Sequence, residues 1–202
     1  ADTFTRPDAI VMTGAATWSR RDNAFGTIHY MPEADVVAGL TLCAAMDVHP
    51  FVYTMRADGS MLDVYHAAVA MNKAEESFYL ERVHLRLKRF HTGTPLPPAS
   101  LPRTILFFAM GERFNHNVAN LEVFAPGVSK AAAVLELKKR IGADRLVVFG
   151  DNLNDLPMLA AADVAVAVEN AFPEVKEHAD IVIGPNYTDS VAQYILQDYT
   201  RQ

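Results

Sequence analysis

The sequence contains only one cysteine, Cys43, among its 202 residues. A lone cysteine cannot form an intrachain disulfide, which predicts a reducing compartment, and we expect a cytoplasmic protein. Cys43 lies in an apolar run with helical spacing, which favours a small packing residue. The seven histidines form no His-x-His or His-x-x-x-His pair, so no zinc site is expected from them.

Positive charge is also scarce. Lys and Arg together number 18 against 24 Asp and Glu, and the formal net charge is −6. A nucleic-acid partner is therefore not expected, because the sequence shows no basic face to meet a phosphate backbone. A membrane partner is not expected either, because no apolar run is long enough to span a bilayer. A small phosphorylated molecule remains possible as a partner, since one lysine and one metal ion can hold a phosphate.

The most informative stretch is an apolar run, residues 146–149, followed by Gly150 and a cluster of oxygen ligands. The run is typical of a buried strand in a parallel sheet, and Gly150 allows a sharp turn at its end. Asp151, Asn154 and Asp155 then follow within five residues. Such side chains at the carboxyl end of a parallel strand lie where open α/β sheets bind ligands, and hard oxygen ligands suit Mg²⁺.

A purely structural interpretation of this cluster is also available. Asp155 is a good N-cap for the helix expected to follow, and Pro157 suits the first turn of that helix. Capping needs only one carboxylate, however, and does not account for Asp151 and Asn154 as well.

Lys130 is the second candidate for a chemical role. Ser129 is an expected N-cap, which places Lys130 in the first turn of a helix over residues 129–141. A cation there opposes the helix dipole, while the free N–H groups of the helix start attract an anion. We expect Lys130 to hold a phosphate against a metal at Asp151. The alternative is an exposed lysine whose amine contacts only water.

The order of expected elements predicts an α/β fold with a second module. From Leu121 to Tyr199, strands and helices alternate at short intervals, which is typical of a parallel sheet. Residues 25–109 are expected to form paired strands with interspersed helices, including a long helix over residues 72–90. We therefore predict a core of residues 1–24 and 110–202 and an inserted α+β module of residues 25–109.

Lys130 and the Gly150-Asp151-x-x-Asn154-Asp155 stretch together resemble two motifs of the haloacid dehalogenase-like (HAD) hydrolases. The chain looks most like the Cof-type sugar-phosphate phosphatases of that superfamily. The match continues through Val164–Val168, Asn170-Ala171, Val175-Lys176 and Asp189–Ala192, and more weakly reaches back to Ile10–Ala15. Thr13 stands where that branch usually has Asn, and Ser190 where it usually has Gly.

The resemblance implies a Rossmann-like parallel sheet core, with residues 25–109 as a cap that selects the substrate. It implies a Mg²⁺-dependent phosphatase of small phosphorylated metabolites such as sugar phosphates, acting through an aspartyl-phosphate intermediate. By the same resemblance, Lys130 steadies the phosphoryl charge and Asn154 contacts the phosphate or substrate. Asp151 and Asp155 hold the metal or its waters.

Two motifs of that family are absent from this sequence, and the second of them, a Ser or Thr at a strand end, is missing from its expected place. The Asp-x-Asp-x-Thr segment that carries the nucleophile has no counterpart, and the nearest stretch, residues 56–60, is an expected hairpin turn. We therefore expect a core that is incomplete at its N-terminus and a chain that is inactive alone. A fragment of a longer phosphatase is the favoured interpretation, and a truncated, catalytically dead product is the other.

Two further alternatives belong to other functional classes. The first is a non-catalytic phosphate- or metal-binding protein, suggested by the missing nucleophile. The second is the phosphorylation domain of a cation-transport ATPase, which has a similar Gly-Asp-x-x-Asn-Asp-x-Pro-x-Leu stretch. The lack of a membrane segment and the continuing match to the Cof-type branch count against the second.

Overall fold

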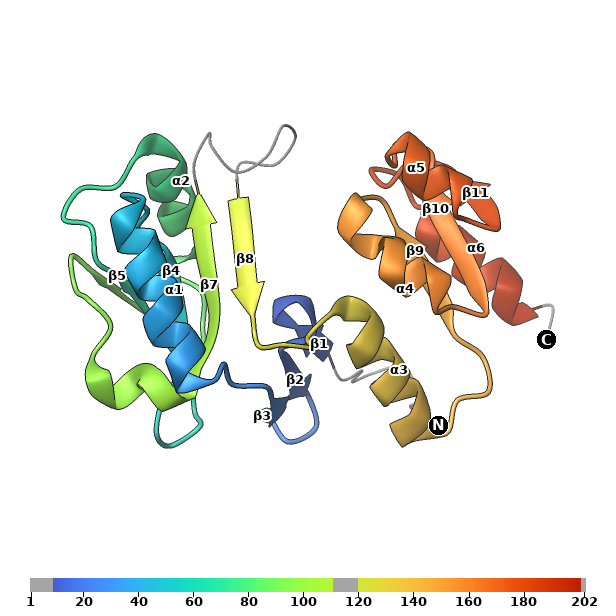
Figure 1. The fold of residues 1–202 in the computed structure, drawn as a ribbon. Helices are drawn as coiled ribbons and strands as arrows, with labels where there is room; N and C mark the ends of the chain where they lie inside the picture. The colour runs from blue at the N-terminus through green and yellow to red at the C-terminus, as the bar shows by residue number, and fades with distance from the viewer. Residues whose placement is uncertain (1–8, 111–119, 201–202) are drawn as a thin grey trace. The chain divides into compact units, whose positions relative to one another are not determined.

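The computed structural model describes residues 9–110 and 120–200 of the chain. It divides into two compact units, Ala1–Val128 and Ser129–Gln202, coloured blue to yellow and yellow to red in Figure 1. Each unit has buried hydrophobic clusters of its own. Within the described residues, no helix combines the length and apolar character that crossing a bilayer requires.

The second unit is built on a parallel three-stranded sheet in the order β11-β10-β9. Its strands are β9 (Val147–Gly150), β10 (Val164–Val168) and β11 (Ile181–Ile183). Its helices are α3 (Lys130–Ile141), α4 (Leu156–Ala160), α5 (Pro173–Glu177) and α6 (Ser190–Thr200), with a 3₁₀ turn, η3 (Leu153–Asp155), between β9 and α4. The predicted alternation of strands and helices around a parallel sheet is confirmed for residues 130–200. It is wrong for the strand expected at residues 121–124, which pairs antiparallel with β7 (Thr104–Met110) in the first unit.

The central strand β10 shows why a continuous apolar run predicts a strand of this sheet. A strand with a partner on each side and cover on both faces needs apolar residues throughout rather than alternation. Residues 165–168 are accordingly all buried. Three of them, Ala165, Ala167 and Val168, pack in one cluster with Val148 of β9, Leu159 of α4 and Val175 of α5.

The first unit holds a five-stranded mixed sheet in the order β6-β5-β4-β7-β8 (Figure 1). Its strands are β4 (Phe51–Met55), β5 (Leu62–His66), β6 (Lys88–Thr92), β7 (Thr104–Met110) and β8 (Asn120–Phe124). Its helices are α1 (Glu33–Ala45) and α2 (Lys73–Arg82), with the 3₁₀ segment η2 (Pro98–Arg103) before β7. A smaller antiparallel sheet combines β1 (Ala9–Val11), β2 (Ala16–Ser19) and β3 (Ala24–Ile28), with the 3₁₀ turn η1 (Met12–Gly14) between β1 and β2.

The long helix expected over residues 72–90 is wrong. Helix α2 begins after Asn72, which forms a capping box with Glu75, and it ends at Arg82. Leu87 takes a positive φ of 70°, which breaks any helix there. Residues 88–92 instead form β6 and pair in parallel with β5. This pairing packs Phe90 against Phe51, with ring centroids 6.1 Å apart, and tertiary packing overrides the helical pattern.

The predicted domain boundaries differ from the division into compact units. Strand β8 pairs antiparallel with β7, so residues 120–124 belong to the sheet of the first unit. The strands over residues 9–28 lie in that unit too, where Ala15 is fully buried in its core. The assignment of residues 1–24 and 110–202 to a core and 25–109 to a cap stays a prediction. Its parts over residues 1–8, 111–119 and 201–202 lie outside the described residues.

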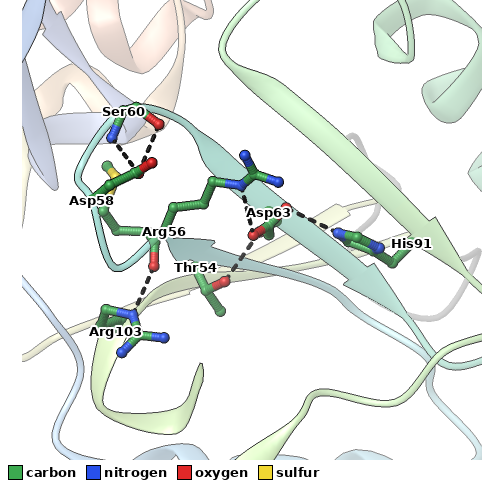
Figure 2. Close-up of polar contacts among 8 residues, drawn as sticks. Thr54, Arg56, Asp58, Ser60, Asp63, His91 and Arg103 are labelled. Atoms are coloured by element: carbon green, nitrogen blue, oxygen red, sulfur yellow. Dashed lines mark hydrogen bonds and ion pairs between the residues drawn. The ribbon is translucent and has the colours of Figure 1, made fainter. Parts of the chain in front are cut away.

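The hairpin turn expected over residues 56–60 is confirmed. It joins β4 to β5, and Asp58 accepts hydrogen bonds from the backbone N (2.9 Å) and hydroxyl (2.7 Å) of Ser60 (Figure 2). Next to this turn, Asp63 accepts a hydrogen bond from Arg56 Nε at 3.2 Å and bonds His91 Nε2 at 2.9 Å. Asp58 is therefore a turn residue of an antiparallel hairpin, which is not the position of a nucleophile after a parallel strand.

Replacing Phe51 by Ala tests this account of the first unit's core. Phe51 is fully buried and its ring packs on Phe78 at 4.9 Å, so the change should lower the free energy of unfolding by about 3–5 kcal/mol. Urea denaturation measures the effect. Leu42→Ala, at a side chain that is 61% exposed, is the control and should shift it by no more than about 0.5 kcal/mol. Equal effects of the two changes would contradict the packing described.

Candidate functional site

The four predicted site residues all lie in the second unit. Asp151, Asn154 and Asp155 follow strand β9, and Lys130 begins helix α3. The structure brings two of them into direct contact, because Lys130 Nζ donates a hydrogen bond to Asp155 Oδ1 at 2.6 Å. These residues are 25 positions apart in the chain. The contact therefore joins the start of α3 to the loop after β9.

Asp155 is the most constrained member of the group. Its side chain is only 5% exposed. While Oδ1 accepts from Lys130, Oδ2 accepts from the backbone N–H groups of Asp151 at 3.1 Å and Asn152 at 3.2 Å. An ionised carboxylate has about four lone-pair sites, and three of them are used here. Asp155 is thus poorly placed to bind a metal directly, but it can still contact a metal-bound water.

Asp155 occupies the expected N-cap position of α4, but its side chain does not cap that helix. Its backbone is already helical at that position. The reason is the turn η3, which starts the helical path at Asn152 instead. The Asp155 side chain folds back toward Asn152 in a capping box, which leaves it pointing at Lys130.

Gly150 makes room for this arrangement. A Cβ at Gly150 would lie 2.9 Å from Asp155 Cβ and 3.2 Å from Leu159 Cδ1, closer than side chains tolerate. Gly150 is not among the glycines with positive φ. The sequence therefore requires glycine here for clearance rather than for the sharp turn that was expected.

The ionisation of Asp155 follows from its contacts. Burial by itself would raise the pKa of the carboxyl group. The hydrogen bond from Lys130, together with those from the backbone of Asp151 and Asn152, outweighs burial, so the pKa of Asp155 lies below its ordinary value. A carboxylate and an ammonium ion therefore face each other at neutral pH.

Lys130 is the first residue of α3, after the N-cap Ser129, whose hydroxyl accepts from Ala132 N at 3.1 Å. The Lys130 side chain is 34% exposed. The alternative of a lysine that contacts only water does not describe the structure. The ammonium group has three N–H donors, and the contact with Asp155 leaves others for an anion.

Asp151 and Asn154 are both exposed. Asp151 Oδ2 accepts a hydrogen bond from Asn186 Nδ2 at 3.3 Å, and its backbone oxygen accepts from Phe172 N at 3.0 Å. Asn154 lies in η3, and among the described residues no hydrogen bond joins its side chain to Lys130, Asp151 or Asp155. The structure thus places Asn154 in the same loop without connecting it to the rest of the group.

Two asparagines to which the sequence analysis gave no role also lie at the carboxyl ends of the parallel strands. Asn170 follows β10 and Asn186 follows β11, and the two side chains bond each other at 3.0 Å. The carboxyl ends of parallel strands meet at one edge of a sheet. The rule that points to Asp151 after β9 therefore also points to Asn170 and Asn186.

The donor set can be compared with the needs of Mg²⁺. The described part of the chain contains no group of three or more His, Cys, Asp or Glu side chains that could hold a metal. Mg²⁺ commonly takes only one or two protein carboxylates, several waters and a substrate phosphate. The exposed carboxylate of Asp151 fits one such ligand, and the Asp151 backbone N donates to Asp155 Oδ2.

Residues 105–195 match the haloacid dehalogenase-like hydrolase family. The chain is 39% identical over 83 residues to the 5-amino-6-(5-phospho-D-ribitylamino)uracil phosphatase YcsE of Bacillus subtilis, over 40% of this chain and 33% of that protein. It is 56% identical over 52 residues to the pyridoxal phosphate phosphatase YbhA of Escherichia coli, over 26% of this chain and 19% of that protein. The chain thus spans a third or less of the length of these curated relatives.

Solved structures agree in fold. The HAD subclass IIB sugar phosphatase BT4131 matches with a TM-score of 0.70 and 20% identity, over 94% of this chain and 75% of that one. A haloacid dehalogenase-like hydrolase from Bacteroides thetaiotaomicron matches with a TM-score of 0.67 and 18% identity, over 92% of this chain and 74% of that one. At these identities the likeness shows the fold alone. The resemblance drawn from Lys130 and the motif over residues 150–155 is confirmed, and so is the expected fold class.

The ion pair predicts a pH dependence of stability. The folded-state pKa of Asp155 lies below its unfolded value of about 3.9, so the contribution of the carboxylate is present above that value and is lost as the pH falls through the folded-state pKa. Asp155→Asn should therefore reduce the free energy of unfolding at pH 7 and have a smaller effect in acid. Urea denaturation at pH 7 and at an acidic pH below the folded-state pKa of Asp155 measures the two free energies of unfolding.

Asp144→Asn, at an exposed position, is the matched control and should have little effect at either pH. A loss at Asp155→Asn that is equally large at neutral and acidic pH would contradict the ion pair as its cause.

Proposed function

Since residues 105–195 match the haloacid dehalogenase-like hydrolase family, we propose that the chain provides the lysine and the acidic loop of a phosphatase site. The site is Mg²⁺-dependent and acts on small phosphorylated metabolites such as sugar phosphates. The relatives named above carry phosphatase names, which supports the reaction class, while the particular substrate and the metal are part of the proposal.

The contact between Lys130 and Asp155 is the observation that carries the proposal. In phosphoryl transfer the protein chiefly positions the phosphoryl group and neutralises its charge. At 2.6 Å from Asp155 Oδ1, the ammonium of Lys130 is held in one place by a buried, ionised partner. Lys130 then directs its remaining N–H donors to phosphate oxygens. The free N–H groups at the start of α3 add to the attraction.

The metal is assigned to the acidic loop. Asp151 is the direct ligand, and Asp155 orients Lys130 and contacts a metal-bound water. Asn154, exposed in the same loop, contacts the phosphate or the substrate. When bound, Mg²⁺ supplies charge neutralisation on the phosphate oxygens. Lys130 supplies the matching charge from the protein.

The nucleophile is assigned to residues outside this sequence. No Asp-x-Asp pair occurs among the 202 residues, so the chain alone is proposed to be inactive. In this proposal, residues 25–109 form the cap that selects the substrate. The same absence favours a second candidate, a non-catalytic phosphate- or metal-binding protein that uses the same Lys130 and Asp151.

Phosphate binding tests the site itself. Calorimetric titration with inorganic phosphate in the presence of Mg²⁺ should show binding that Lys130→Ala weakens by roughly tenfold or more, because a hydrogen bond to a charged group contributes about 1.5–3 kcal/mol. Lys139→Ala, in the last turn of the same helix, is the control for a lost charge and should bind as the wild type does. Equal binding by the Lys130 variant and the wild type would remove the proposed role.

Catalysis is tested separately, with the protein that the complete reading frame encodes. Hydrolysis of sugar phosphates that requires Mg²⁺ and fails in Lys130→Ala would support the phosphatase. A complete product that binds phosphate but hydrolyses none of a panel of sugar phosphates would favour the non-catalytic candidate.

A further inference from the structure

A chain of side-chain amides leads from two loops to Asp151. Asn170, after β10, accepts a hydrogen bond through Oδ1 from the backbone N of Asn186 at 2.9 Å. Asn170 Nδ2 donates to Asn186 Oδ1 at 3.0 Å. Asn186 Nδ2 in turn donates to Asp151 Oδ2 at 3.3 Å. Two hydrogen bonds therefore join the loops after β10 and β11, and the series continues to the loop after β9 through a third.

The direction of every bond in this series is fixed by its two ends. A backbone N–H can only donate, so the atom of Asn170 that faces it must be the oxygen. The nitrogen of Asn170 then faces Asn186, whose oxygen must accept. The nitrogen of Asn186 is left to face Asp151, which as a carboxylate can only accept. Neither amide can be turned over without placing two donors or two acceptors against each other.

The loop that carries Asn186 is itself closed by local bonds. Ser190 Oγ lies 2.8 Å from Gly184 O and 2.9 Å from Pro185 O, and Thr188 Oγ1 donates to Pro185 O at 2.8 Å. The backbone of Asp151 is also tied to the loop after β10, through the bond from Phe172 N to Asp151 O. The amides therefore connect backbone segments that are already fastened at the sheet edge.

We propose that Asn170 and Asn186 are positioning residues that hold the Asp151 carboxylate in one orientation through Oδ2 and leave Oδ1 for a divalent cation. The proposal rests on the metal site assigned to Asp151 in the proposed function. Asparagine suits the task because it donates a hydrogen bond without adding charge that would compete with the cation. Partners that orient a metal ligand typically change metal affinity by 10–100-fold when they are removed.

The orientation of Asp151 is measured without metal. In the NMR spectrum of the 202-residue chain, the couplings between Hα and the Hβ protons of Asp151 report its χ1 rotamer. The wild type should show one rotamer, and Asn186→Ala and Asn170→Ala should show averaging. Thr188→Val removes a hydrogen bond from the same loop but not from the amide series, so it should retain the wild-type couplings.

Couplings of Asp151 that are already averaged in the wild type would overturn the inference, as would couplings in Asn186→Ala equal to those of the wild type. Averaging in Thr188→Val as strong as in Asn186→Ala would also overturn it, because a general loosening of the loop would then be the cause.

Titration with Mg²⁺ alone, followed by backbone amide shifts of residues 150–155, tests the consequence. Asn186→Ala should raise the Mg²⁺ concentration at the midpoint of the titration about tenfold. Thr188→Val should leave that concentration within about a factor of two of the wild-type value. An unchanged midpoint in Asn186→Ala would overturn the link to the cation. A wild type that binds no Mg²⁺ would instead overturn the metal part of the proposed function, and the Asp151 couplings would still decide whether the amides position that residue.

Discussion

The candidate site depends on one interaction, the ion pair of Lys130 with the buried carboxylate of Asp155. It forms because Gly150 leaves room for Asp155 to fold back and because η3 turns its side chain away from α4. The backbone N–H groups of Asp151 and Asn152 donate the other two hydrogen bonds to that carboxylate. One ammonium ion is thereby held at a defined place beside an exposed loop. A residue that would otherwise be a flexible surface lysine becomes a fixed positive charge.

The parallel sheet of the second unit explains why the other polar groups converge. Strands β9, β10 and β11 run in the same direction, so the loops at their carboxyl ends share one edge. Asp151, Asn170 and Asn186 come from these successive loops and are joined by hydrogen bonds. The buried apolar residues of β10 contribute to the core of this unit, and the polar residues of the loops supply the chemistry proposed for that edge.

The strand β9 and the acidic loop after it could be predicted from the sequence, because an apolar run followed by Gly150 and two carboxylates is a distinctive pattern. The helix position of Lys130 predicts a phosphate contact beside the acidic loop, and the structure adds a direct ion pair with Asp155 that the sequence does not predict. Helix α2 and strand β6 could not be separated, because residues 83–90 continue a helical pattern and only the pairing with β5 makes them a strand. Asn186 has no spacing motif of its own, and only its position after the short strand β11 indicates that it lies at the same sheet edge as Asp151.

The most direct test of the central claim is a crystal structure of the chain grown with Mg²⁺ and inorganic phosphate. The account predicts a phosphate ion within hydrogen-bonding distance of Lys130 Nζ and a metal ion ligated by Asp151, with Asp155 still bound to Lys130. A phosphate and a metal bound elsewhere on the chain, or Lys130 turned away from Asp155 toward solvent, would contradict it.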